Sequence, residues 1–580
     1  MKTRRLIPIA RENHTIEQKI AKPTKAKVLR YPSALFPSLP SVKVQFCCHV
    51  GIILAALLVL AGCGKRETAV EAGIRTQTLI VGNFAEPASL DPQVTNAISE
   101  NCILIALFEG LTALDERTSQ PVPAVAERWD VSPDGLVYTF HLRSSARWSN
   151  GDPVTAADFA FAFQRLLKPE FGATYANMLH PIKNAQAFNR GTIRDFSAVG
   201  AAAVDAHTLR LTLERPTPHL PALATNLVWL PLHQPTLAKH RAVDNRTAPW
   251  ARPGNLVGNG PFVLTEWRPN DRVVVAKNPH YWDAAHNRLE RVIFLPIENS
   301  GVEERNFRAG QMHVTFAVPP SKIDSYRQHA PDRLRIDPWI GTNYVNFNVT
   351  KPPLDNAKLR RALALAIDRD AIARTVYQGA AQPALTFTAP DHSGYVPPAR
   401  PAHNFAAARA LLAEAGFPGG RGLPSFPMQM ISDDTFPKVA EVIQAMWLRE
   451  LGVRITIEPL EQKTCIQNQQ TLAHTLGLMG WGADYAAPST FLDTLRTGDG
   501  NNWTGWGSKD YDSLLDQAAN TVDPQMRFQI LQRAEALLLE AAPIAPYVHP
   551  ARAYLIHPAV KNWLAAPLVY HRYQYVWLEK

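Results

Sequence analysis

One segment in the second half of the chain predicts an amphipathic helix that runs directly into a β-strand. Apolar residues recur there at helical spacing and would share one helix face: Val439, Ile443, Met446 and Trp447. Gly452 follows and supplies the left-handed residue that commonly ends a helix. The next apolar residues alternate with polar ones, as in a half-buried strand, at Val453, Ile455 and Ile457. A helix tied this closely to a strand predicts α/β packing.

The alternation of helices and strands extends over the rest of the chain. A helix is expected to open at Asp355 and Asn356 and to end before Gly379, with an apolar face formed by Leu359, Leu363 and Ile367. Thr155 and Asp158 match a helix-capping pattern. Strands are expected at residues 78–81, 136–142, 204–213, 273–276 and 291–297. The predicted fold class is therefore α/β.

An apolar run from Val50 to Ala61 indicates export from the cytoplasm. It is too short for a permanent membrane helix, which needs roughly 20 residues, but it fits a secretory signal. Its end and the residues after it resemble the bacterial lipobox, whose cysteine is acylated: Leu60, Ala61, Gly62 and Cys63. Residues 1–62 are therefore expected to be a lipoprotein signal sequence, with a lipid anchor at Cys63. A chance cysteine after a buried apolar segment is the alternative.

The net charge of +9 belongs to this leader. Residues 1–62 hold ten Lys or Arg and two Glu, which leaves 50 basic and 49 acidic residues in the remainder. A nearly neutral remainder lacks the basic excess that attracts phosphates, so nucleic acid is excluded as a partner. The leader is also long before its apolar run, and we expect translation to begin nearer to Val42 or Val44.

The sequence carries no local motif of a catalytic or metal site. It has no Gly-x-Ser-x-Gly elbow, His-Glu-x-x-His pair, phosphate loop or Cys-x-x-Cys pair. Its 18 histidines lack the spacing of metal ligands on a helix. We therefore expect a protein that is not an enzyme and uses no metal or cofactor. Cys102 and Cys465 are expected to be free, buried thiols, with a disulfide between them as the alternative.

Several motifs carry a resemblance to a known family. They are EPASLDP at residues 86–92, LFEGLT at 107–112, WSNGDPVT at 148–155, GNGPF at 258–262, KNPHYW at 277–282 and GWGADY at 480–485. In this order they resemble the peptide and oligopeptide substrate-binding proteins of ABC importers. The last motif is most similar to the oligopeptide-binding branch.

By this resemblance the chain has a periplasmic-binding-protein fold of two hinged α/β lobes with an extra inserted domain. Ligand is then enclosed between the lobes when the hinge closes. The expected division is a tether and the start of lobe I at 63–98, the inserted domain at 99–237, the remainder of lobe I at 238–340, lobe II at 341–549 and a C-terminal return to lobe I at 550–580.

The resemblance also implies a ligand site. Asp484 matches the aspartate that holds the α-amino group of a bound peptide, and a buried ammonium needs such a carboxylate. The residues that match segments running beside the peptide as added strands are Glu86, Ala88, Ser89, Gly480, Trp481 and Gly482. The aromatic residues at or beside ligand-lining positions are Tyr175, Tyr344, Trp481 and Tyr485. The alternatives are a loop or capping role for Asp484 and core packing for the aromatic residues.

Some positions depart from the family. Leu478 stands where oligopeptide binders carry an arginine, and Phe436 stands where a histidine occurs; both positions are linked to the peptide's carboxylate. The family's preference for peptide length therefore does not carry over. Gly341 and Gly482 occupy positions where some relatives have a disulfide, so that disulfide is not expected here.

The function implied by the resemblance is capture of short peptides through their backbone and α-amino group. The expected partners are an ABC permease and its ATPase, and the expected state is a lipid-anchored monomer on the periplasmic or extracytoplasmic face of a membrane. The alternatives are a dedicated binder of a cell-wall peptide or another small solute, a peptidase on the same scaffold, and a lipoprotein that serves adhesion or signalling.

Overall fold

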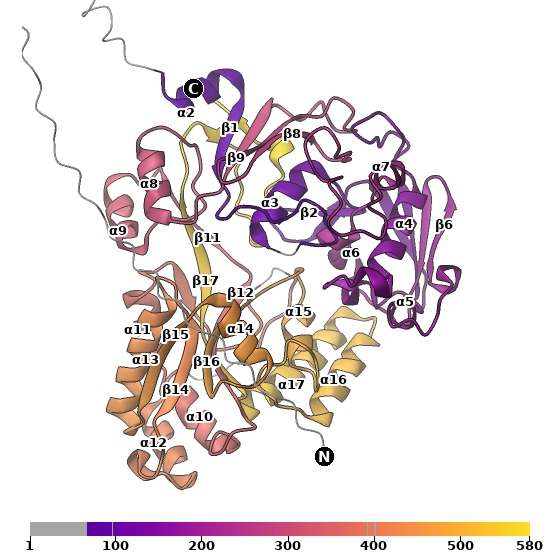
Figure 1. Cartoon of the computed structure of the whole chain (residues 1–580). Coiled ribbons are helices and arrows are strands. Elements are labelled where there is room, and N and C mark those ends of the chain that lie inside the picture. Colours follow the sequence, from indigo (N-terminus) through magenta and orange to yellow (C-terminus); the bar gives the residue numbers. More distant parts are fainter. Residues whose placement is uncertain (1–66, 96, 391–392, 399–401) are drawn as a thin grey trace, which may run out of the picture. The chain divides into compact units, whose positions relative to one another are not determined.

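Three large β-sheets organise residues 67–95, 97–390, 393–398 and 402–580, the part of the chain that the computed structural model describes (Figure 1). Helices lie between the strands along the chain, which confirms the α/β class. The predicted signal sequence and the predicted lipid anchor at Cys63 lie outside the described residues. The domain boundaries given above stay a prediction.

The first sheet combines a strand from the start of the described chain with three strands from much later. Its order is β1-β10-β9-β8, with bounds Thr78–Gly82 (β1), Arg291–Leu295 (β10), Arg272–Lys277 (β9) and Phe262–Arg268 (β8). β1 and β10 are parallel, and the other pairs are antiparallel. Helices α2 (Ala69–Thr76) and α3 (Ile98–Leu107) lie before and after β1 in the chain.

The second sheet is antiparallel and comes from residues 126–212. Its order is β4-β5-β7-β6, with bounds Ala126–Val131 (β4), Val137–Leu142 (β5), Thr208–Thr212 (β7) and Ala201–Asp205 (β6). Helix α4 (Ala156–Leu167) packs on this sheet. It begins with the predicted capping interaction, because the Asp158 carboxylate accepts the Thr155 N–H at 2.8 Å.

The strand predicted over residues 204–213 is wrong as a single element. The structure has two strands there, β6 and β7, joined by a tight turn. The Asp205 carboxylate accepts the His207 N–H at 2.8 Å, and this local hydrogen bond stabilises the turn. The apolar residues on both sides of the turn obscured it in the sequence.

The third sheet is the largest and has the order β11-β17-β12-β16-β14-β15, with β13 paired to β17. The bounds are Leu334–Pro338 (β11), Gly341–Phe347 (β12), Ala381–Pro383 (β13), Phe426–Ile431 (β14), Ile455–Leu460 (β15), Leu476–Gly482 (β16) and Ile544–Leu555 (β17). The predicted helix-to-strand unit is confirmed. Helix α13 (Phe436–Leu451) packs on β14 and β15, and Gly452 adopts a φ of 69° directly after the helix.

The single helix predicted to open at Asp355 and Asn356 and to end before Gly379 is divided into two in the structure. Helix α10 (Ala357–Leu365) ends before Ile367, and a second helix, α11 (Arg369–Thr375), begins soon after. The cause is an N-cap within the apolar pattern: the Asp368 carboxylate accepts an N–H from the first turn of α11 at 3.0 Å.

The remaining helices connect the sheets and cover their faces. Their bounds are Ala185–Asn189 (α5), Leu220–Leu223 (α6), Gln234–Lys239 (α7), Ser300–Arg308 (α8), Pro320–His329 (α9), Phe405–Glu414 (α12), Gln462–Gln470 (α14), Ser489–Leu492 (α15), Lys509–Ala519 (α16) and Pro524–Ala541 (α17). Among the described residues, no helix has both the length and the apolar character that a membrane span requires.

The C-terminal segment returns to the first sheet after leaving the third. Gln77, next to β1, donates its side-chain amide to the Leu578 carbonyl at 2.8 Å and accepts the Leu578 N–H at 3.2 Å. Strands β18 (Val560–Lys561) and β19 (Trp577–Leu578) pair with each other in this segment. The last residues of the chain therefore help to hold its first described strand.

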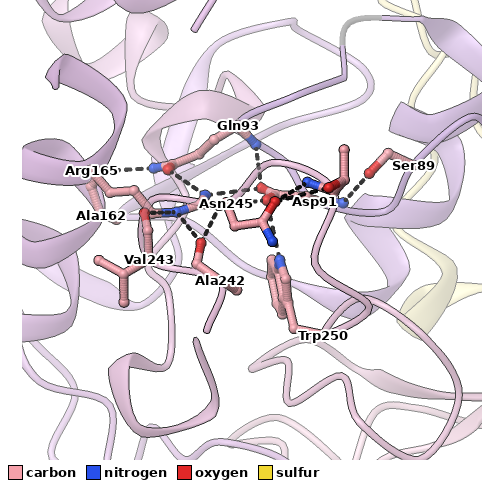
Figure 2. Close-up of polar contacts among 10 residues, drawn as sticks. Ser89, Asp91, Gln93, Ala162, Arg165, Ala242, Val243, Asn245 and Trp250 are labelled. Atoms are coloured by element: carbon pink, nitrogen blue, oxygen red, sulfur yellow. Dashed lines mark hydrogen bonds and ion pairs between the residues drawn. The ribbon is translucent and has the colours of Figure 1, made fainter. Parts of the chain in front are cut away.

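A buried ion pair ties the loop after β1 to helix α4 (Figure 2). The Arg165 guanidinium donates to both carboxylate oxygens of Asp91, at 2.8 and 3.2 Å, and to the Gln93 side chain at 2.8 Å. The Trp250 indole donates to the same Asp91 carboxylate at 3.2 Å. Arg165 and Asp91 are 1% and 2% exposed, so each depends on the other for compensation of its charge.

The two cysteines among the described residues are free thiols. Cys102 lies in α3 and Cys465 in α14, and both are buried. Burial raises the pKa of the Cys102 thiol to about 11, so the reactive thiolate is scarce at neutral pH. The prediction of two free, buried thiols is confirmed.

Candidate functional site

Asp484 lies in the loop between β16 and α15, at one end of the third sheet. Its N–H donates to the Thr490 hydroxyl at 3.0 Å, and its carbonyl oxygen accepts from the Asn226 side-chain amide at 3.5 Å. Its side chain is half-buried, and no described residue donates a hydrogen bond to its carboxylate or forms an ion pair with it. The N-cap of α15 is Pro488, so Asp484 does not cap that helix.

The environment of Asp484 disfavours its charge. Burial raises the pKa of this carboxyl to about 7, because the carboxylate loses water here without gaining a protein donor. About half of the molecules therefore carry the charge at neutral pH. A bound cation with N–H donors would replace the lost hydration and favour the ionised form.

Three cavities meet at Asp484. The largest has a volume of about 640 Å³ and is lined by residues around α6 together with residues of α15 and α17. The second has a volume of about 230 Å³ and the third about 60 Å³; both are lined by residues of α3 and by the C-terminal Tyr570. Small-molecule sites occupy roughly 300–1,000 Å³, so the largest cavity has the size of a ligand site.

Two predicted aromatic residues line the largest cavity. The Trp481 indole donates to the Thr490 carbonyl at 2.8 Å. The Tyr485 ring stacks on the His219 imidazole, with ring centroids 5.4 Å apart and an interplanar angle of 4°, and its hydroxyl lies 3.1 Å from the Ser489 hydroxyl. These contacts fix both rings, so they form rigid apolar walls beside the Asp484 carboxylate.

The second cavity contains residues that the sequence predicted and others that it missed. Tyr175 and Gly482, both named in the sequence prediction, line it, and their contacts with a ligand stay a prediction. Tyr570 and Asn101 also line it, and the Asn101 side-chain amide donates to the Tyr570 hydroxyl at 3.0 Å. Tyr570 comes from the C-terminal segment, and no local motif marks it; only the fold brings it to Asp484.

The glycines of β16 allow close packing behind the site. A Cβ atom at Gly480 would lie 2.4 Å from the Asn343 side-chain oxygen in the neighbouring strand. A Cβ atom at Gly482 would lie 2.8 Å from the Trp339 ring, and Trp339 lines the second cavity. Gly480 itself is absent from the described residues that line the three cavities. Its position is therefore one of close strand packing.

The predicted residues Glu86, Ala88 and Ser89 form hydrogen bonds with other residues of the fold. The Glu86 carboxylate accepts from the Trp267 indole at 2.8 Å and from a backbone N–H at 2.9 Å. The Ala88 N–H donates to the Glu100 carboxylate at 2.8 Å, and the Ser89 hydroxyl accepts a backbone N–H at 3.1 Å. None of the three lines the cavities that the described residues form around Asp484, so their ligand contacts stay a prediction.

Tyr344 occupies the core of the third sheet. Its side chain is 7% exposed, and its ring packs edge-on against Phe387 with centroids 5.4 Å apart. It does not line any of the three cavities within the described part of the chain. Its contacts are therefore those of a core residue, which was the alternative given for the aromatic residues.

The positions that depart from the family lie on elements of the third sheet and its covering helix α13. Leu478 is fully buried in β16 and contributes no charge. Phe436 is the first residue of α13 and packs against the core of the third sheet. Gly341 and Gly482 are direct partners in the pairing of β12 with β16, which is where a cross-strand disulfide would otherwise fit.

One cluster of possible metal ligands lies elsewhere. Atoms of Asp368, Asp370 and His403 that are able to bind a metal lie within 4.8 Å of one another. Asp368 already caps α11 and lies 3.6 Å from the His403 ring, so these contacts account for its position. None of the three lines the cavities around Asp484.

The chain is similar to a known protein family and to several known proteins. Residues 120–503 match the model of the bacterial extracellular solute-binding proteins, family 5 middle. The chain is 35% identical to the probable deoxycholate-binding periplasmic protein YgiS of Escherichia coli, over 83% of this chain and 90% of that protein. It is 32% identical to the periplasmic oligopeptide-binding protein OppA of Salmonella typhimurium, over 88% and 94%.

Solved structures show the same similarity. The structure of the Escherichia coli murein tripeptide binding protein MppA matches with a TM-score of 0.76 and 32% identity. The match covers 87% of this chain and 98% of that one. The likeness therefore includes all three large sheets rather than one part of the fold.

Proposed function

Because this chain belongs to family 5 of the bacterial extracellular solute-binding proteins, we propose that it captures short peptides and delivers them to an ABC permease driven by a separate ATPase. Its fold class is the periplasmic-binding-protein fold that the resemblance implied. Relatives named for oligopeptides and for a murein tripeptide support a peptide ligand. Their periplasmic location supports action outside the cytoplasm.

The observation that carries the proposal is the unpartnered Asp484 carboxylate. It is half-buried, its pKa is raised to about 7 by burial, and it meets three cavities. A peptide α-ammonium has the charge and the N–H donors that this carboxylate lacks. Trp481, Tyr485 and Tyr175 would then line the ligand, with main-chain hydrogen bonds from β16 as a further source of affinity.

Three further parts of the proposal concern properties other than ligand binding. We propose that Cys63 carries the lipid anchor, that the mature chain is a monomer and that it catalyses no reaction. The proposal that it catalyses no reaction is supported by its membership of a family of binding proteins and by the lack of a catalytic motif in the sequence. Incubation with peptides, followed by a search for cleavage products, tests it directly.

A dedicated ligand is the second candidate function. Leu478 and Phe436 provide no charge where oligopeptide binders place basic residues, and this departure favours specialisation. The relatives named for deoxycholate and for a murein tripeptide are also dedicated to one kind of ligand by name. Competition between trialanine, a murein tripeptide and deoxycholate separates these candidates.

The test of the main proposal is calorimetric titration of the purified protein with trialanine and with N-acetyl-trialanine. Loss of the ammonium should weaken binding by about ten- to hundred-fold, the range for a hydrogen-bonded charge. Asp484→Asn should lose this discrimination. Glu214→Gln is the matched control, because Glu214 lines the same cavity but is exposed and already accepts a backbone N–H at 2.6 Å. Equal binding of both peptides by the unmodified protein would refute the proposal.

A further inference from the structure

The largest cavity contains two charged residues that lack partners. Five charged residues along its walls bind another described residue at 3.7 Å or less: Glu214, Arg215, Asp493, Arg496 and Asp499. Asp484 and Arg527 line the same cavity, and their side chains have no hydrogen-bonding or ion-pair partner among the described residues. The cavity therefore presents one free negative and one free positive group.

Arg527 lies in the first turn of α17. Its Nη1 atom is buried from solvent and has no acceptor among the described residues. Asp523 is the nearest helix-capping acid, but its carboxylate already accepts the Met526 N–H at 2.7 Å. The Phe528 ring, 5.4 Å from the guanidinium carbon, makes its only cation–π contact among the described residues. A buried guanidinium nitrogen in this state lacks the acceptor that such groups normally have.

The surroundings of Arg527 favour an anion. Burial lowers the pKa of Arg527, although Tyr138 and Asp523 partly offset this, and His219, which lies near Arg527, is held uncharged because its pKa is lowered to about 3. The backbone N–H groups at the start of α17 add the positive end of the helix dipole. An anion at Arg527 would accept the hydrogen bond for which its buried Nη1 atom has no acceptor among the described residues.

We propose that Arg527 binds a carboxylate group of the ligand, so that the cavity takes a zwitterionic peptide with its ammonium at Asp484 and a carboxylate at Arg527. The inference rests on the proposed function, because it adds the anionic half of the same ligand. The guanidinium group suits a carboxylate, since its N–H groups match two carboxylate oxygens. The carboxylate belongs either to the peptide C-terminus or to an acidic side chain.

This arrangement makes both charges necessary for tight binding. A ligand with only one charge leaves either the half-buried Asp484 or the half-buried Arg527 unpaired, which is costly. It also explains how a chain with Leu478 and Phe436 at the family's carboxylate positions still recognises a carboxylate. The basic residue is supplied by α17 rather than by β16 or α13.

The experiment compares three peptides by calorimetric titration: trialanine, trialanine amide, and the amide of Ala-Glu-Ala. The proteins are the unmodified chain, Arg527→Met, Arg527→Lys and the control Arg215→Met, which removes an arginine that lines the same cavity but is half-exposed and paired with Asp516. Amidation of trialanine should weaken binding to the unmodified protein and to Arg215→Met by about ten- to hundred-fold. It should have no effect on Arg527→Met, and Arg527→Lys should retain part of the effect.

The amide of Ala-Glu-Ala identifies the source of the carboxylate. If it binds the unmodified protein more tightly than trialanine amide does, an acidic side chain serves at Arg527; if it binds like trialanine amide, the C-terminus serves. Either result supports the inference, provided that Arg527→Met abolishes the difference. An amidation effect that is unchanged in Arg527→Met, or equal binding of all three peptides to the unmodified protein, overturns it.

Discrimination against N-acetyl-trialanine separates this inference from the proposed function. If Arg527→Met keeps that discrimination, the site is folded and the ammonium subsite is intact, so a negative result counts against Arg527 alone. If the unmodified protein never distinguishes the acetylated peptide, the proposed function fails whatever Arg527 does.

Discussion

Lowering the pH from 7 to 5 should weaken peptide binding about fifty-fold. The pKa of Asp484 is about 7 in the free protein, and only the ionised carboxylate binds an ammonium. About half of the molecules are ionised at pH 7 and about 1% at pH 5, so the apparent Kd rises by the ratio of these fractions. The peptide α-amino group stays protonated over this range because its pKa is about 8. His219 also contributes no titration here, since its pKa is lowered to about 3.

The sign of the effect follows from the raised pKa. In the free protein, the pKa of Asp484 is raised from its ordinary value of 3.8 to about 7, so the folded protein holds the proton more tightly than the unfolded chain does. This proton contributes to the stability of the fold in full below pH 3.8, and the contribution is lost as the pH rises through about 7. Binding of an ammonium reverses the preference and expels the proton. At pH 6 roughly 0.9 proton should be released for each peptide bound.

Calorimetric titration at pH 7, 6 and 5, in two buffers with different ionisation enthalpies, measures both the affinity and the proton release. Asp484→Asn should bind weakly and with little dependence on pH, whereas Glu214→Gln should keep the full dependence. A Kd that is constant between pH 7 and 5, or a pH dependence that survives in Asp484→Asn, would refute the reasoning.

Three other predictions concern the fold. Arg165→Met should lower the free energy of unfolding by about 3–5 kcal/mol in urea titrations, because it leaves the buried Asp91 carboxylate without its cation; a loss below about 1 kcal/mol contradicts this. Gly480→Ala should lower the melting temperature, since its Cβ would lie 2.4 Å from a neighbouring side-chain oxygen, whereas Gly500→Ala, with open space around it, should not. The two buried cysteines should react with a thiol reagent only after unfolding, and rapid reaction of the native protein would argue against their burial.

The parts of the fold that were predicted well are those with local signals. Helix α13 and strand β15 follow from an apolar face, a stop at Gly452 and an alternating strand. The divided elements were missed because a short polar side chain, Asp205 or Asp368, makes a local hydrogen bond within an otherwise continuous apolar pattern. Such a bond is decisive in the structure but weak as a sequence signal.

In the candidate site, too, sequence reasoning reached the residues of one motif but not the residues that lie far from it in the chain. Asp484, Trp481 and Tyr485 share one motif, and resemblance to the family was enough to propose them as site residues. Tyr570 and Arg527 lie far from this motif in the sequence, and their importance depends on which cavity they line and whether their polar atoms have partners. Those properties exist only once the three sheets are assembled.

The most direct test of the central claim is native mass spectrometry of the protein purified without denaturation, followed by ejection of its bound cargo. We predict a set of masses that fit short peptides with free amino and carboxyl groups, and the loss of this cargo from Asp484→Asn but not from Glu214→Gln. A single recurrent mass of a compound without an amino group would contradict the account and would identify a dedicated importer of another solute.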